Sequence, residues 1–197
     1  MKKYRILILG ASYGSLLGIK LALAGHDVDL VCLPKEAELI NKEGAIVRLP
    51  IRDKDKVIEL RSTDCPGSLR ALGPSDVEIS TYDLIALAMQ EPQYGADEIA
   101  KLLKEIGLSK KPCMSIMNMP PLPYIARIEG LDTSKLDGAY TKPDVWKYFD
   151  SNYMTLCSPD PQAFRPPDEN INVLQVGLPT NFKAARFESD QHTQILR

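Results

Sequence analysis

Arg5-Ile6-Leu7-Ile8-Leu9 is a short apolar run, and it leads directly into Gly10-Ala11-Ser12-Tyr13-Gly14-Ser15. A helical apolar pattern then runs from about Tyr13 to Ala24, and Gly25 follows where a positive-φ residue is expected after a helix. Small residues let the backbone turn sharply from a strand into a helix, and the free N–H groups of the first helical turn can then face a pyrophosphate. This order predicts the beginning of a dinucleotide-binding βαβ unit.

The rest of the chain continues an alternation of strands and helices. Apolar runs predict strands at 28–32, 83–89 and 113–117, and helical periodicity predicts helices at 35–42, 97–106 and 122–129. We expect Gly107 to end the second of these helices, a hairpin to join 45–49 to 57–60, and a loop between 65 and 74. Weaker strand patterns lie at 139–140, 154–157 and 171–176. The fold class predicted is α/β, a doubly wound and mostly parallel sheet of the Rossmann type.

The domain organisation expected from these patterns is one large domain followed by a fragment. Residues 1–179 are predicted to form the dinucleotide-binding domain, and 180–197 the beginning of a helical C-terminal domain. The last helical pattern is still apolar at Ile195 and Leu196, and no glycine or proline follows to end it. We interpret this as an incomplete element. Pairing of two copies into a homodimer through this helix is an option that the sequence leaves open.

The charge balance limits the classes of partner. The chain of 197 residues has 24 Lys and Arg against 26 Asp and Glu, without a long run of one sign, so neither nucleic acid nor an anionic membrane is expected. No apolar stretch approaches the roughly 20 residues that span a bilayer, and Gly10 breaks the first apolar run without a signal-like cleavage region. We therefore expect a cytoplasmic protein whose partner is a small-molecule substrate.

The cysteines and histidines give no metal-binding spacing. Four cysteines are far apart without a C-x-x-C pair, and there are two histidines, so no metal is expected. Cys32 and Cys113 lie in apolar runs, where a buried thiol is favoured over a nucleophile because no base lies nearby in sequence. For His26 we favour a structural role in the turn after the first helix, and for His192 a place on a helix surface.

The glycine-rich turn departs from the standard G-x-G-x-x-G pattern. Gly10 and Gly14 are one residue closer than in that fingerprint, and Ser12 stands near the place of the middle glycine. The Ser12 hydroxyl could donate to a phosphate, but its Cβ narrows the space for the pyrophosphate. Tyr13 could cover the turn or fill a pocket. The alternative is a tight strand-to-helix turn that binds nothing, although the strand, turn and helix context favours binding.

The end of the second predicted strand bears on the choice of coenzyme. It reads Val31-Cys32-Leu33-Pro34-Lys35, without the acid that would bind the ribose hydroxyls of NAD. Lys35 could instead meet a 2′-phosphate, which gives a weak preference for NADP, or it could be a solvated lysine at the start of a helix. The cofactor predicted is NADP or NAD.

Three stretches carry a resemblance to a known family. Residues 6–28, Asp83-Leu84-Ile85-Ala86-Leu87-Ala88-Met89-Gln90-Glu91-Pro92-Gln93 and Ser115-Ile116-Met117-Asn118 resemble the ketopantoate reductase-like (2-dehydropantoate 2-reductase) proteins of the 6-phosphogluconate dehydrogenase-like group. The resemblance covers about the first 120 residues. It implies NADP bound to an N-terminal Rossmann domain and reduction of a 2-oxo acid, with a helical C-terminal domain that completes the site.

The resemblance also implies roles for particular residues. Asn118 would be catalytic, beside the nicotinamide and the substrate, although an asparagine that satisfies its own loop backbone is an equal alternative. Gln90 stands where the family often has lysine, and Leu33 where it has a phosphate-binding arginine, with Lys35 two places on. The family's catalytic lysine belongs to the helical domain. The cofactor-binding residues predicted are Gly10, Ala11, Ser12, Tyr13, Gly14, Ser15, Lys35, Met89 and Gln90.

Two other classes compete with this interpretation. A short-chain dehydrogenase also accepts Gly-Ala-Ser-x-Gly, but it needs a tyrosine four residues before a lysine, and none of the eight tyrosines has one. That class is excluded. A non-catalytic nucleotide-sensing or assembly module remains, because the altered turn and Gln90 could mark lost catalysis. Without the helical domain that the resemblance implies, we expect the present chain to bind cofactor better than it turns over substrate.

Overall fold

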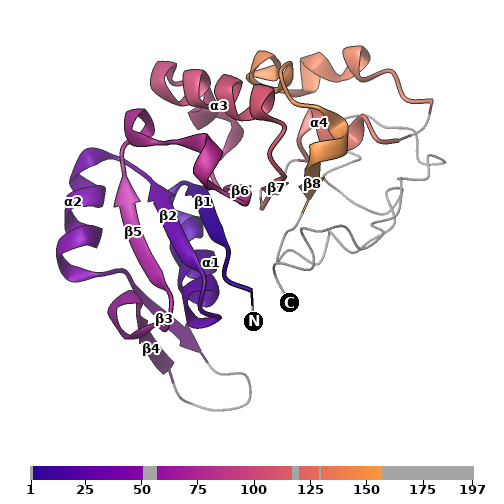
Figure 1. Cartoon of the computed structure of the whole chain (residues 1–197). Coiled ribbons are helices and arrows are strands. Elements are labelled where there is room, and N and C mark those ends of the chain that lie inside the picture. The colour runs from indigo at the N-terminus through magenta and orange to yellow at the C-terminus, as the bar shows by residue number, and fades with distance from the viewer. Residues whose placement is uncertain (1, 51–56, 117–119, 129, 157–197) are drawn as a thin grey trace. The chain divides into compact units, whose positions relative to one another are not determined.

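The computed structural model describes residues 2–50, 57–116, 120–128 and 130–156. The chain divides into two compact units, Met1–Ala88 and Met89–Arg197. Within the described ranges the first unit has four parallel strands and the second has two, and helices accompany both sets (Figure 1). This Rossmann-like α/β arrangement confirms the fold class predicted from the sequence.

The first unit is built on a parallel sheet. Its strands are β1 (Arg5–Leu9), β2 (Asp27–Val31), β5 (Ser68–Leu72) and β6 (Leu84–Leu87), in the order β5-β2-β1-β6 (Figure 1). Strands β1 and β6 are almost wholly buried apolar runs, as expected for parallel strands covered on both faces. Leu9 lies opposite both Val31 and Leu87, so three strands end together at one edge of the sheet.

Helix α1 (Ala11–Leu23) packs on one face of this sheet through two glycines. A Cβ at Gly14 would lie 2.8 Å from Ile8 Cγ2, and one at Gly18 would lie 2.9 Å from Leu69 Cδ1. The helix begins two residues earlier than the predicted Tyr13, because the turn needs only Gly10 outside helical geometry. Gly25 has the positive φ, 91°, that its place after the helix predicted.

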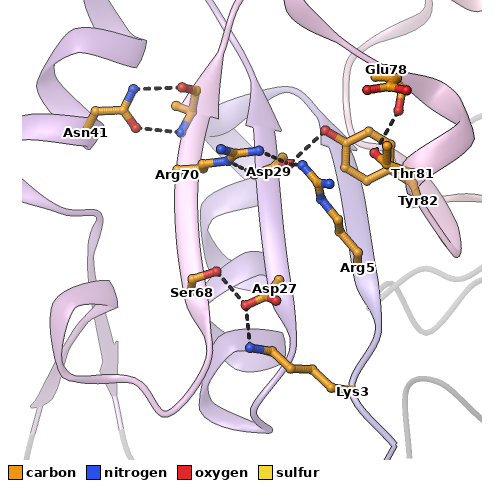
Figure 2. Close-up of polar contacts among 11 residues, drawn as sticks. Lys3, Arg5, Asp27, Asp29, Asn41, Ser68, Arg70, Glu78, Thr81 and Tyr82 are labelled. Carbon is orange, nitrogen blue, oxygen red and sulfur yellow. Dashed lines mark hydrogen bonds and ion pairs between the residues drawn. The ribbon is translucent and has the colours of Figure 1, made fainter.

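The predicted hairpin is present, and a strand was missed. Strands β3 (Ile46–Pro50) and β4 (Val57–Arg61) pair antiparallel, while the turn 51–56 lies outside the described residues. The expected loop at 65–74 is wrong in part, because β5 runs through it and pairs with β2. Asn41 of α2 (Pro34–Glu43) holds this edge strand by accepting from Ala71 N–H at 2.8 Å and donating to its carbonyl at 2.7 Å (Figure 2).

A buried carboxylate ties three of these strands, and the segment just before β6, together on the face opposite α1. Asp29 of β2, 3% exposed, accepts from Arg5 at 3.1 Å and from the Tyr82 hydroxyl at 2.7 Å, and Arg70 of β5 binds both of its oxygens (Figure 2). Burial alone would raise the pKa of Asp29, but hydrogen bonds from Arg70, Tyr82 and Arg5 outweigh it and lower that pKa. The network therefore stays charged at neutral pH.

The second unit contains α3 (Asp97–Ser109), β7 (Cys113–Ser115), α4 (Leu122–Ile125) and β8 (Met154–Leu156), with β7 and β8 parallel. The expectation that Gly107 ends α3 is wrong. Gly107 lies inside the helix and against the Tyr148 backbone, where a Cβ would come within 2.8 Å. The helix ends two residues later at Ser109, and Lys110 follows as its C-cap with φ 53°. Close packing, and not a cap, explains this glycine.

Other details of the second unit also differ from expectation. The predicted strand at 139–140 is wrong, because Ala139 closes a 3-10 helix, Thr133–Ala139. Helix α4 is shorter than the predicted 122–129, whereas the strand predicted at 154–157 is confirmed as β8. The strand pattern at 171–176, the boundary at 179 and His192 lie outside the described residues. Within the ranges that the structure covers, no helix is both long and apolar enough to cross a bilayer.

Candidate functional site

Gly10 forms the turn at the shared edge of β1, β2 and β6. Its backbone angles, φ 106° and ψ 122°, are ones that side-chain-bearing residues rarely adopt. Its N–H donates to Val31 O at 2.8 Å, and Ala88 N–H donates to Leu9 O at 2.9 Å. The turn is therefore fixed to both neighbouring strands, and its conformation requires glycine.

The N-terminus of α1 is open to an anion. The helix begins at Ala11 with no side-chain cap and no acidic residue in its first turn, so its first N–H groups have no partner from the helix itself. Ser12 and Tyr13 are exposed there, Tyr13 by 60%. The positive end of the helix dipole and these N–H groups favour a phosphate at this position.

Two of the predicted turn residues have internal roles. Gly14 is buried against Ile8, which is the close helix-to-strand packing that the last glycine of such fingerprints provides. Ser15 donates its hydroxyl to Ala11 O at 2.6 Å. Ser12 and Tyr13 are therefore the predicted turn residues whose hydroxyl-bearing side chains are exposed.

The region after β2 contains an acid that the sequence interpretation missed. Glu36, in the first turn of α2, accepts from Leu33 N–H at 3.2 Å, so its carboxylate lies back at the end of the strand beside exposed Lys35. The signal was a Glu three residues after the residue that precedes the helix, the spacing of a capping box. Lys35 and Glu36 thus bring opposite charges to the place where an adenosine ribose is expected.

Cys32 at the same place is a buried thiol. It is 7% exposed, and burial, together with the charge of Glu36, raises its pKa to about 11. Cys113 is buried as well, and burial raises its pKa too. His26 is buried in the turn after α1, where Tyr4 N–H donates to its Nδ1 at 3.4 Å. These positions agree with the structural roles expected for all three side chains.

The loop that begins the second unit is held by its own side chains. Met89 N–H donates to the Tyr94 hydroxyl at 3.0 Å, and Gln90 N–H donates to Gln93 Oε1 at 2.8 Å. The Gln90 side chain itself is exposed. Sequence analysis did not find the roles of Tyr94 and Gln93, because both fall in a Pro-containing segment that shows no periodicity.

Glu91, next in this loop, is a second buried carboxylate. It is 6% exposed and accepts from the backbone N–H groups of Thr141, at 3.0 Å, and of Lys142. Asn118, the predicted catalytic residue, lies outside the described residues. Among the residues that are described, no cluster of three or more His, Cys, Asp or Glu could hold a metal ion.

Comparison with known proteins finds likeness in fold alone. No family model matches, and no curated protein matches. Among solved structures, a proposed ketopantoate reductase from Ralstonia solanacearum MolK2 is similar at 18% identity and a TM-score of 0.53, over 80% of this chain and 45% of that one. At this identity the likeness supports the α/β fold and leaves the chemistry to be argued from the residues.

Two further structures give lower scores. A proposed 2-dehydropantoate 2-reductase from Enterococcus faecalis has 23% identity and a TM-score of 0.47, over 77% of this chain and 40% of that one. A 2-dehydropantoate 2-reductase from Methylococcus capsulatus has 22% identity and a TM-score of 0.41, over 59% and 34%. The present chain thus spans less than half the length of each of these three structures.

Proposed function

We propose that this chain is the coenzyme-binding part of an NAD(P)-dependent reductase that transfers hydride to a small 2-oxo acid. The observation that carries the proposal is the Gly10 turn, whose positive φ and fixed hydrogen bonds lead into an uncapped helix at the end of a buried parallel strand. That combination is the physical requirement for binding a pyrophosphate. The fold shared with the Ralstonia reductase supports it.

The choice between the two coenzymes depends on Lys35 and Glu36. A lysine ammonium would attract the 2′-phosphate of NADP, whereas a carboxylate would repel it and could accept from the ribose hydroxyls of NAD. Glu36 already accepts one hydrogen bond from Leu33 N–H. Because the two charges compete, we propose weak discrimination, with NADP retained as the first candidate.

The catalytic half of the proposal is separate from coenzyme binding. Hydride transfer to a ketone builds negative charge on its oxygen, and a cationic acid is best suited to stabilise and protonate it. Gln90 can donate a hydrogen bond but no proton, so we propose it as a coenzyme contact and not as the acid, with Asn118 proposed beside the nicotinamide. A nucleotide-sensing module is the second candidate, because Gln90 in the place of a lysine would explain an absence of turnover.

Fluorescence titration with NADPH and with NADH tests the binding half of the proposal. We expect saturable binding of both coenzymes, with less than about a tenfold difference in Kd because Lys35 and Glu36 oppose each other. Oxidation of bound NADPH on addition of a series of small 2-oxo acids tests the catalytic half. Binding without oxidation is expected of a coenzyme-binding part and also agrees with the module, oxidation favours the reductase, and no binding of either coenzyme contradicts both functions.

A further inference from the structure

Tyr94 is completely buried in the second unit, and its hydroxyl binds the backbone at the start of that unit. The side chain is 0% exposed, and the hydroxyl accepts from Met89 N–H at 3.0 Å. Burial raises the pKa of Tyr94, so the hydroxyl is neutral at physiological pH. A buried side chain five residues further along the chain therefore fixes the direction of the Met89 N–H.

The Tyr94 ring is itself held by other aromatic rings. It packs edge-on against Trp146, with ring centroids 5.7 Å apart and planes at 70°. Trp146 is only 3% exposed, and its ring lies 5.8 Å from that of Phe149. Ring contacts of this kind add to the gain from apolar burial. The hydroxyl of Tyr94 is therefore presented to Met89 from a fixed position.

Two residues near Tyr94 in the same loop hold it to the segment that contains Trp146. Glu91 accepts from Thr141 N–H at 3.0 Å. Gly95 packs so closely that a Cβ there would lie 2.8 Å from Lys142 Cε. The loop is thus held at three positions. A loop that is already ordered loses little conformational freedom when a ligand binds to it, so its rigidity favours binding.

The backbone that Tyr94 fixes follows β6, where part of a dinucleotide is expected. From β1 the chain passes outward through β2 to β5, and it then returns to the other side of β1 as β6 (Figure 1). Dinucleotides bind across such a reversal of strand order, with the adenosine half toward the second strand. The residues after β6 are therefore expected to meet the nicotinamide half. Gln90, which is exposed and follows Met89, is the coenzyme contact proposed there.

From these contacts we infer that Tyr94 is a positioning residue for the coenzyme. Its hydroxyl holds the Met89 N–H, and the fixed Met89 backbone sets the position from which Gln90 meets the nicotinamide half. Tyr94 has no exposed surface, so it acts only through its neighbours. A contact that is in place before binding costs less entropy, so this hydrogen bond increases the affinity for the coenzyme. This role rests on the proposed coenzyme site and extends it to a residue outside that site.

Titration of NADPH into the variant Tyr94→Phe tests this role, because the change removes the acceptor and keeps the ring that packs on Trp146. We expect NADPH to bind about threefold to tenfold more weakly than to the wild type, as for the loss of one hydrogen bond. Tyr82→Phe is the matched control. It also removes a buried hydroxyl, but one that binds Asp29 just before β6 begins, so it should leave the affinity unchanged.

A double-mutant cycle with Gln90→Ala separates positioning from a general structural effect. Gln90→Ala should weaken NADPH binding, and Tyr94→Phe should then weaken it no further, because the side chain that it positions is gone. A structural effect would lower the affinity by the same factor in both backgrounds. The role of Tyr94 is overturned, while the coenzyme site stands, if Tyr94→Phe binds like the wild type or like Tyr82→Phe, if Gln90→Ala has no effect, or if the two losses add. If the wild type binds no NADPH, the proposed function fails and the role of Tyr94 with it.

Discussion

Asp29 and Glu91 are both carboxylates buried in an α/β fold, yet they are satisfied in different ways. Asp29, in the first unit, is held by charged side chains from β1 and β5 and by the Tyr82 hydroxyl. Each carboxylate is stable only because its partners replace the water that it lost. The partners of Asp29 come from separate strands, so its loss should affect the whole sheet of the first unit.

Glu91, in the second unit, is bound by two consecutive backbone N–H groups, those of Thr141 and Lys142. These donors carry no net charge, and they belong to a single loop. Glu91 thus fastens one loop to the segment that begins with Met89, where the coenzyme proposal needs a fixed backbone. The comparison teaches that buried charge organises a whole sheet in one unit and a single loop connection in the other.

Replacing Asp29 with alanine should have the largest effect. The change leaves Arg5, Arg70 and the Tyr82 hydroxyl without their common acceptor, and breaking such a buried ion pair costs about 3–5 kcal/mol. Because both arginines are partly exposed and can regain water, we expect the lower end of that range. Hydrogen exchange of the β1 and β2 amides measures it, and exchange as slow as in the wild type would contradict a sheet-wide role.

The variant Glu91→Gln should cost less, about 1–3 kcal/mol, because one acceptor oxygen remains for two backbone donors. Amide exchange at Thr141 and Lys142 should become faster while that of β1 stays unchanged. Exposed Glu98→Gln on α3 is the matched control and should change neither. A general loss of protection across both units would show that the distinction between sheet and loop is wrong.

Removal of one hydroxyl gives a smaller effect. Tyr82→Phe deletes the 2.7 Å hydrogen bond to Asp29 and leaves both arginines in place, so we expect a loss of about 1 kcal/mol in unfolding free energy. Denaturant titration of the variant beside the wild type measures it. A loss as large as that of Asp29→Ala would mean that the hydroxyl, and not the guanidinium pair, holds the carboxylate.

The smallest expected effect is the change with pH in the stability that Asp29 contributes. Near neutral pH this contribution does not change. The folded-state pKa of Asp29 is below the unfolded value of 3.8, so its stabilisation is complete above that value and is lost as the pH falls through the folded pKa. The stabilities of wild type and Asp29→Asn should therefore begin to approach each other as the pH falls below 3.8, and should converge below the folded-state pKa of Asp29. If the stability curves of the two proteins stay parallel down to the pH of acid unfolding, the charge of Asp29 does not stabilise the fold.

The local features of the fold could be predicted from the sequence, and the long-range ones could not. The turn at Gly10 could be predicted because the strand, the glycine and the helix are consecutive in the sequence. Strand β5 was missed because it follows the loop residues Pro66 and Gly67, and because it depends on pairing with β2 and on the hydrogen bonds from Asn41. Gly107 was misinterpreted because its packing partner, Tyr148, is far along the chain.

The same limit applies to the candidate site. The glycine turn and Lys35 follow from patterns within a few residues. By contrast, the donors to Glu91 lie about 50 residues away along the chain, and the arginine donors to Asp29 lie 24 and 41 residues away. No periodicity encodes such pairs. Glu36 is the exception, because its spacing from Leu33 is a local signal that could have been used.

Calorimetric titration of NADPH into the wild type and into Ser12→Asp tests the central claim most directly. Ser12 is exposed, and an acid in the first turn of α1 should not harm folding, but it would face the pyrophosphate with like charge. Lys20→Gln makes the same change in net charge about 12 Å further along α1. We predict that Ser12→Asp abolishes measurable binding and Lys20→Gln preserves it; equal affinity in both variants, or no heat with the wild type, would contradict a coenzyme site at this turn.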